Sequence, residues 1–240
     1  MGKTISSSIF SDAHIHVTPS LLPFLKGISC IANADSPEEY LWLTKNKLPS
    51  MTISAGIHPW KAENTSWQEM EPVLRTCSVI GEIGLDGTWC DTALNIQREV
   101  FRRQLLLAHT FGKPVILHTK GMEGEVLQTI RQYPNRYLIH WYSCQDFLYE
   151  YMDLDCWFTV GPDLCSNFCV QRLAKTVPLN RLLVESDGLE GLIWGQDLTL
   201  APSDYPKIMG QQMQTLALLR NIPVDLLASQ ISENLNAFLF

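Results

Sequence analysis

The residues best suited to bind a metal ion lie near the start of the chain, in the stretch DAHIH. Asp12, His14 and His16 are spaced two apart, and side chains two apart on a β-strand point to the same face. Imidazoles and carboxylates are common ligands of zinc and related divalent cations. His14 and His16 therefore predict one edge of a metal site, although an isolated pair of this kind is as often structural. Asp12 is predicted either to hydrogen-bond a ligating histidine or to be a buried, satisfied carboxylate.

Further candidates occupy similar places, each at or near the end of a short apolar run. They are His58 in AGIHP, Glu82 in IGEIGLD, His118 in PVILHTK, His140 in YLIHWYS and Asp187 in LLVESD. Each has a structural alternative, since a lone strand histidine is often a satisfied core residue and an aspartate after a strand often caps a helix. Independent structural roles would not gather so many such residues at strand ends, and the joint pattern favours one shared site. His109 is the exception among the histidines and falls on a predicted helix.

Apolar, β-rich runs alternate with helical segments along the chain. The predicted strands cover residues 8–16, 28–33, 51–57, 78–83, 114–118, 137–141, 156–160 and 181–186. The predicted helices cover residues 36–46, 67–76, 94–112, 122–133, 145–153, 164–176, 205–220 and 223–238. Residues 188–206 are left as a long segment, either a lid or a partner surface.

This alternation predicts the α/β class and a (β/α)8 TIM-type barrel, with a doubly wound open sheet as the alternative. Near-continuous apolar strands are typical of a parallel sheet covered on both faces. A barrel brings the carboxyl ends of all its strands to one mouth, which is where the candidate ligands fall. No linker or repeat divides the chain, so residues 1–240 are expected to form a single domain.

Composition narrows the function classes. Apolar residues make up 46% of the chain and charged residues 18%, with a formal net charge of −7. This balance argues against a non-specific nucleic-acid coat and against a binder of anionic membranes. We expect neither a signal peptide nor a membrane span, because no apolar run is long enough or follows a basic start. The seven cysteines form no CxxC pair, which favours reduced thiols in a cytoplasmic protein.

Several segments together resemble the TatD family of metal-dependent hydrolases. They are DAHIH (12–16), GIHPW (56–60), GEIGLD (81–86), QREVF (97–101), KPVILHTK (113–120), IHWYS (139–143), ESD (185–187) and the pair EN (233–234). The resemblance implies a (β/α)8 barrel and hydrolysis, with nuclease activity at DNA 3′ ends in several members. It also implies two divalent ions, of zinc, magnesium or manganese. One would be held by His14, His16, Glu82 and Asp187, and the other by Glu82, His118 and His140.

Departures from the family pattern all lie around the predicted substrate rim. Gly87 follows GLD where a tyrosine is common, and Lys120 precedes Gly121 where arginine and an acidic residue are common. The segment after Asp187 has no lysine or arginine before Lys207. None of these changes removes a predicted ligand.

The predicted chemistry is hydrolysis by a metal-activated water, with Asp187 as general base and Glu82 as bridging ligand. His58 is predicted either to bind substrate or to be structural. Lys120 would steady an anionic oxygen or remain solvated. Trp141 and Tyr142 would stack on a base or pack at the strand edge.

Three functions compete at this stage. The first is a phosphodiesterase acting on nucleic-acid ends. The second is an amidohydrolase or esterase for a small molecule, favoured by the apolar stretch around Trp194. The third is a metal-binding module that recognises a partner without turnover. The sequence does not decide the oligomeric state.

Overall fold

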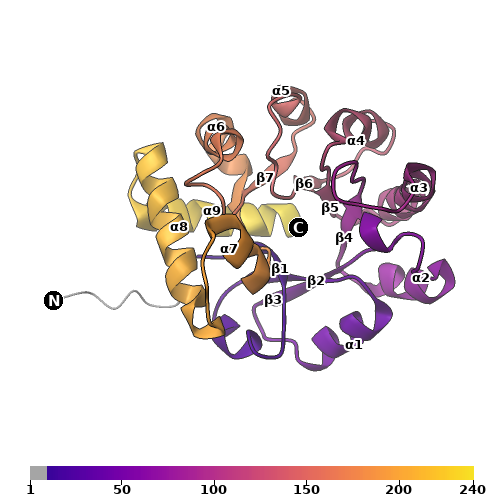
Figure 1. Cartoon of the computed structure of the whole chain (residues 1–240), viewed down its shortest axis with the longest axis horizontal. Helices are drawn as coiled ribbons and strands as arrows, with labels where there is room; N and C mark the ends of the chain where they lie inside the picture. Colours follow the sequence, from indigo (N-terminus) through magenta and orange to yellow (C-terminus); the bar gives the residue numbers. More distant parts are fainter. Residues whose placement is uncertain (1–9) are drawn as a thin grey trace.

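The computed structural model describes residues 10–240, which form eight parallel strands alternating with helices (Figure 1). The strands are β1 (Asp12–His16), β2 (Cys30–Ala34), β3 (Met51–Ala55), β4 (Val79–Gly84), β5 (Val115–His118), β6 (Tyr137–Ile139), β7 (Trp157–Val160) and β8 (Leu182–Val184). They lie in the sheet in the order of the sequence. The Asp187 amide donates to the His14 carbonyl at 3.1 Å, which brings the two ends of the sheet together. The predicted barrel is confirmed, and residues 8 and 9 of the first predicted strand lie outside the described residues.

Helices surround the sheet. They are α1 (Pro37–Lys45), α2 (Trp67–Thr76), α3 (Leu94–Phe111), α4 (Glu123–Ile130), α5 (Leu148–Met152), α6 (Phe168–Thr176), α7 (Gly188–Gln196), α8 (Tyr205–Arg220) and α9 (Val224–Leu239). Short 3-10 turns are η1 (Leu22–Leu25), η2 (Pro59–Lys61), η3 (Leu179–Arg181) and η4 (Pro202–Asp204). Buried apolar side chains of strands and helices form one continuous core. Within residues 10–240 no helix has both the length and the apolar character that crossing a membrane requires.

Residues 188–206, whose role the sequence leaves open, begin with helix α7. Its glycines lower helix propensity and hide the pattern. They are needed for packing, because a Cβ at Gly188 would lie 2.6 Å from the His16 carbonyl oxygen and one at Gly191 would lie 2.6 Å from that of Ser186. Leu192 is fully buried beneath the helix. Close packing against the end of β1 therefore stabilises a helix that propensity alone does not indicate (Figure 1).

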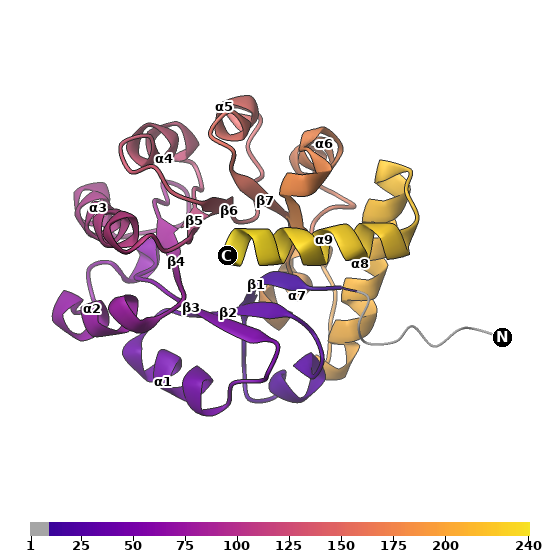
Figure 2. The ribbon, with the colours of Figure 1, turned by 180° about the vertical axis from the view of Figure 1, so that it is seen from behind.

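Helix α9 crosses the opposite end of the barrel, where the strands begin (Figure 2). Asn234 donates from Nδ2 to the carbonyl oxygens of Leu179 and Leu182, both at 2.7 Å. Phe238 packs against Trp157, the first residue of β7, with ring centroids 5.7 Å apart. Helix α9 thus closes one end of the barrel, and the candidate ligands lie at the other end.

We expect Asn234→Ala to lower the free energy of unfolding by about 1–3 kcal/mol, because two buried carbonyls lose their donor. Denaturant unfolding measures the change. Asn236→Ala is the matched control, since Asn236 is exposed on the same helix and its loss costs less than about 0.5 kcal/mol. Equal stability of both variants would contradict the role assigned to Asn234.

Candidate metal centre

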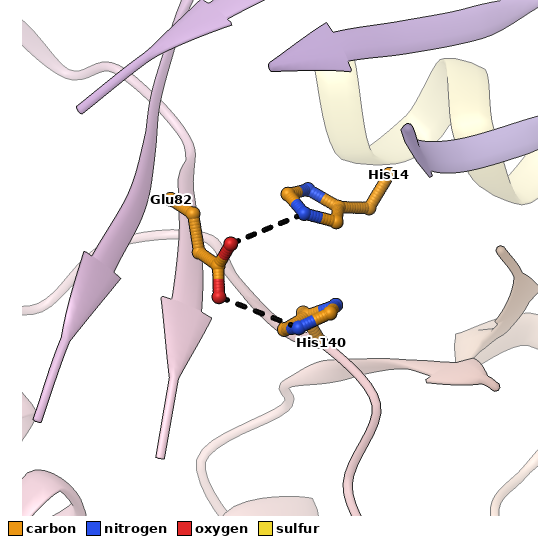
Figure 3. Close-up of side chains that lie close together, drawn as sticks. All are labelled: His14, Glu82 and His140. Atoms are coloured by element: carbon orange, nitrogen blue, oxygen red, sulfur yellow. Dashed lines mark ion pairs between the residues drawn. The ribbon is translucent and has the colours of Figure 1, made fainter. Parts of the chain in front are cut away.

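Glu82 lies at the centre of a cluster of imidazoles at the barrel mouth. Its Oε2 is 3.2 Å from His14 Nε2 and 3.8 Å from His16 Nε2. Its Oε1 is 2.6 Å from His118 Nδ1 and 3.3 Å from His140 Nε2. Figure 3 shows Glu82 facing both His14, which lies on β1, and His140, which directly follows β6. The two carboxylate oxygens therefore face two different sets of histidines.

Ligand atoms on the β1 side are spaced as they would be around a cation. Asp187 Oδ1 lies 3.3 Å from His14 Nε2 and 3.6 Å from His16 Nε2. Ligand atoms with bonds of about 2.0–2.2 Å to one ion are about 3.0–3.5 Å apart in tetrahedral or octahedral geometry. Among the described residues, His14 Nε2 and Asp187 Oδ1 are buried and have no hydrogen-bond partner. Buried polar atoms are normally satisfied, so the arrangement fits a divalent ion.

The charges of the cluster attract a cation. Burial opposes protonation of His14, but contacts with Asp187 and Glu82 outweigh it and raise the pKa of His14 well above its usual value. The pKa of His16 rises to about 9 because Glu82 and Asp187 outweigh its burial in the same way. Burial would raise the pKa of Glu82, whereas His140 and the other imidazoles hold it well below its usual value. The carboxylates that draw protons to these imidazoles also draw a divalent cation.

Asp86 orients His118, a role that the sequence did not suggest. His118 Nε2 donates to Asp86 Oδ2 at 3.0 Å, which leaves Nδ1 facing Glu82. Asp86 also accepts from the Trp60 indole at 2.7 Å and from the amides of Thr88 and Trp89. Burial would raise the pKa of Asp86, but these donors hold it below its usual value. A carboxylate behind a ligating histidine fixes its tautomer and orientation.

Glu185 holds a similar place behind His140. Its Oε1 lies 3.1 Å from His140 Nδ1, while His140 Nε2 faces Glu82. Glu185 and Asp86 lie in the motifs ESD and GEIGLD, but the pattern of strand ends predicts only their neighbours Asp187 and Glu82 as ligands. Residues that orient a ligand are harder to predict from sequence spacing than the ligands themselves.

His58 lies close enough to Glu82 and His118 to share an ion with them, but its own hydrogen bond argues against a ligand role. Its Nε2 is 3.4 Å from both Glu82 Oε1 and His118 Nδ1. Its Nδ1 accepts from the Trp60 amide at 3.2 Å, so the neutral ring carries its proton on Nε2. A protonated nitrogen donates hydrogen bonds and does not bind a metal. This geometry supports a contact between His58 and a substrate oxygen.

Asp12 joins β1, which carries His14, to the segment after β8 that carries Asp187. Its Oδ1 accepts from the amides of His14 at 3.2 Å and Ser186 at 3.1 Å. Its Oδ2 accepts from the hydroxyls of Ser186 and Tyr205. Burial raises the pKa of Asp12 to about 7, against the effect of these donors. The prediction of a bond to a ligating histidine is corrected in one respect, because the donor is the His14 backbone amide.

Of the predicted rim residues, Lys120 lies at the mouth and Tyr142 does not. Lys120 Nζ donates to Ser143 Oγ at 3.0 Å and lies 4.5 Å from the centre of the Trp89 ring. Tyr142 is only 1% exposed, and its hydroxyl donates to the Asp146 carbonyl. The predicted substrate contact of Tyr142 is therefore corrected, because its ring packs edge-on against Phe158 in the core.

Two glycines let the ligand-bearing strands approach one another. A Cβ at Gly84, whose φ is +155°, would lie 1.8 Å from the His118 carbonyl oxygen. Asp187 itself has φ +56°, and Gly188 after it has φ +81°. This left-handed turn aims Asp187 at His14 before α7 begins. Strained backbone of this kind is common at functional sites.

We expect Asp86→Asn to weaken binding of a divalent ion about 10- to 100-fold, because His118 loses the acceptor that orients it. Isothermal titration of the apoprotein with zinc measures the change. Asp91→Asn is the control, since Asp91 is exposed in the same loop. An unchanged affinity in Asp86→Asn would show that Asp86 does not position His118.

Comparisons with known proteins identify the family of this chain. A family model described as TatD related DNase matches residues 12–239. The human 3′-5′ RNA nuclease TATDN2 is 24% identical over 222 residues, which cover 85% of this chain and 29% of that protein. An uncharacterized metal-dependent hydrolase of Haemophilus influenzae is 24% identical over 242 residues, covering 95% of this chain and 94% of the relative.

The solved structures show the same fold. The crystal structure of YJJV, a TatD homolog from Escherichia coli, matches with a TM-score of 0.81 at 22% identity and covers 98% of both chains. The chain spans less than a third of the human relative but nearly all of the Haemophilus one. The family model covers almost the whole chain and contains every candidate ligand, and this protein belongs to the TatD related DNase family.

Proposed function

We propose that this protein is a divalent-metal-dependent phosphodiesterase that hydrolyses nucleic acids at strand ends. The observation that supports this most directly is Glu82, whose two oxygens face separate histidine sets as a bridging ligand would. Paired ions stabilise both the attacking and the leaving oxygen in phosphoryl transfer. The family description names a DNase, and the human relative is named a 3′-5′ RNA nuclease.

We assign the ligands to two ions. His14, His16, Glu82 and Asp187 would hold the first. Glu82, His118 and His140 would hold the second, since both imidazoles lie within 3.3 Å of Glu82 Oε1. An imidazole-rich set suits zinc better than magnesium or manganese, which prefer oxygen ligands. Such ions, when bound, supply Lewis-acid activation of water near neutral pH.

The remaining roles belong to side chains of the chain itself. Burial would raise the pKa of Asp187, but contact with His14 and the nearby imidazoles lowers it, so the carboxylate is ionised and can accept a proton from water. The Nε2–H of His58 would donate to a substrate oxygen. Lys120, whose Nζ contacts Ser143 Oγ and the Trp89 ring, would steady the negative charge of a phosphate. The proposal therefore gives one proton acceptor and two donors to the reacting group.

A cytoplasmic location forms part of the proposal. All seven cysteines are free thiols, and three of them are buried. Disulfides persist mainly in oxidising compartments, so a cysteine-rich chain without any is more common in a reducing one. The substrate we propose, a nucleic-acid end, is also available there.

The test pairs metal content with hydrolysis. We expect about two divalent ions per chain after reconstitution and chelator-sensitive degradation of an end-labelled single strand. His118→Ala should reduce hydrolysis roughly a hundredfold or more, because a ligand of the second ion is lost. His109→Ala is the matched control, since His109 is exposed on α3 and contacts the Pro134 carbonyl and the Tyr133 ring, away from the candidate ligands.

Other outcomes select other functions. Turnover of lactones or cyclic amides but of no phosphodiester would indicate an amidohydrolase or esterase. Bound metal without turnover of any substrate would indicate a metal-binding module for a partner. Failure to bind metal after reconstitution would overturn the ligand assignment itself.

A further inference from the structure

Three tryptophans from separate loops meet at the barrel mouth. Trp194 lies between the other two, with its ring centroid 5.7 Å from that of Trp89 and 5.4 Å from that of Trp141. Both contacts are edge-to-face, at 76° and 74°. This set, here called the tryptophan wall, brings together the segments after β4, β6 and β8. The mechanism proposed above does not use it.

Each tryptophan is linked to a candidate ligand through the chain or through one other residue. Trp141 directly follows His140 in the chain. The Trp89 amide donates to Asp86 Oδ1 at 2.8 Å, and Asp86 orients His118. Trp194 lies on α7, about two helical turns after Asp187. Trp141 makes the closest of these links, since its ring centroid lies 6.2 Å from that of His140, and it joins the tryptophan wall to the metal centre.

The wall presents aromatic surface that the fold does not bury. Trp194 is 63% exposed and Trp89 is 50% exposed. Beyond Trp194 lies a groove of about 400 Å³, lined by this ring, Asp163, Ser166, Asn167 and Phe168, which is 71% exposed. Exposed apolar surface rimmed by polar side chains marks a binding site.

The polar groups of the groove are held in place. Asp163 accepts from the Trp141 indole and from the Asn167 amide group, both at 2.7 Å. These bonds fix the Trp141 ring and the Asn167 side chain, and they leave polar side chains beside the exposed aromatic rings of the groove. A flat heteroaromatic ring with its own donors and acceptors matches this combination of aromatic walls and a polar floor.

The charges around the tryptophan wall argue against a strand being bound mainly through many phosphate contacts. Lys120 places one positive charge next to the Trp89 ring, and Asp163 places a negative charge in the groove. The chain as a whole carries −7. A strand lying here would gain affinity mainly from its bases and from about one phosphate contact.

We propose that the tryptophan wall and its groove form a binding site for unpaired nucleobases of the strand whose end lies at the metal centre. This inference rests on the proposed nuclease function and adds where and how the bases bind. Stacking needs a free ring face, which bases inside a duplex do not offer. The site would therefore select strands by their bases and by the absence of pairing.

Binding of two hydrolysis-resistant ligands by the metal-loaded protein tests this site. The ligands are a short phosphorothioate oligothymidylate and an abasic strand with the same backbone. We expect the first to bind about tenfold or more tightly, and Trp194→Ala or Trp89→Ala to remove most of that preference. Phe111→Ala is the control, because Phe111 is exposed at the end of α3, next to where β5 begins. The slope of log affinity against log salt should be about −1, as for one or two phosphate contacts.

Equal binding of the two ligands, an unchanged preference in both tryptophan variants, or a much steeper salt slope would overturn the site. Base preference without hydrolysis of an unmodified strand would support the site and reject the nuclease. Hydrolysis without base preference would reject the site and leave the nuclease standing. The two proposals therefore fail separately.

Discussion

The Glu82 carboxylate is almost fully buried, and a buried charge is tolerated only when neighbouring groups compensate it. Here the compensation comes from imidazoles on other strands, so the charge ties β1, β5 and the end of β6 to β4. Asp86, Glu185 and Asp12 form a further layer of carboxylates behind these groups. Removing any one charge leaves others unpaired, and the cluster therefore behaves as a unit.

A bound cation would relieve the same constraint. Buried carboxylates and imidazoles crowded at about 3 Å are costly in an empty protein, and a divalent ion satisfies several of them together. Without a bound ion, these crowded groups therefore lower the stability of the folded chain at the barrel mouth. The apolar core and α9 supply stability that compensates for this cost.

The barrel could be predicted because the alternation of apolar strands and amphipathic helices is visible in the local sequence. Each strand is a short apolar run, and His14, Glu82, His118 and Asp187 lie at or near the ends of such runs. Helix α7 was missed because its glycines serve tertiary packing, which a propensity argument cannot weigh. The burial of Tyr142 was missed because Trp141, with φ +39°, turns the chain, which alternation along a strand does not anticipate.

The side chains that act at a distance were also hidden. Asp86 and Glu185 lie only a few residues from candidate ligands, but their function depends on which ring nitrogen they face. That is a property of three-dimensional geometry with no periodic signature. The tryptophan wall is a similar case, since its members are more than 50 residues apart in sequence.

The closure of the barrel by α9 has a consequence for how the molecule can change over evolutionary time. The groups that hold η3 and β8 to α9 lie at the end where strands begin, whereas the rim is built from segments that follow the strands. Substitutions at such distant positions act on the unfolding free energy almost independently. Rim loops can therefore drift, lengthen or exchange aromatic side chains while the closed end preserves the fold. Such an architecture lets substrate range diversify around an unaltered set of ligands.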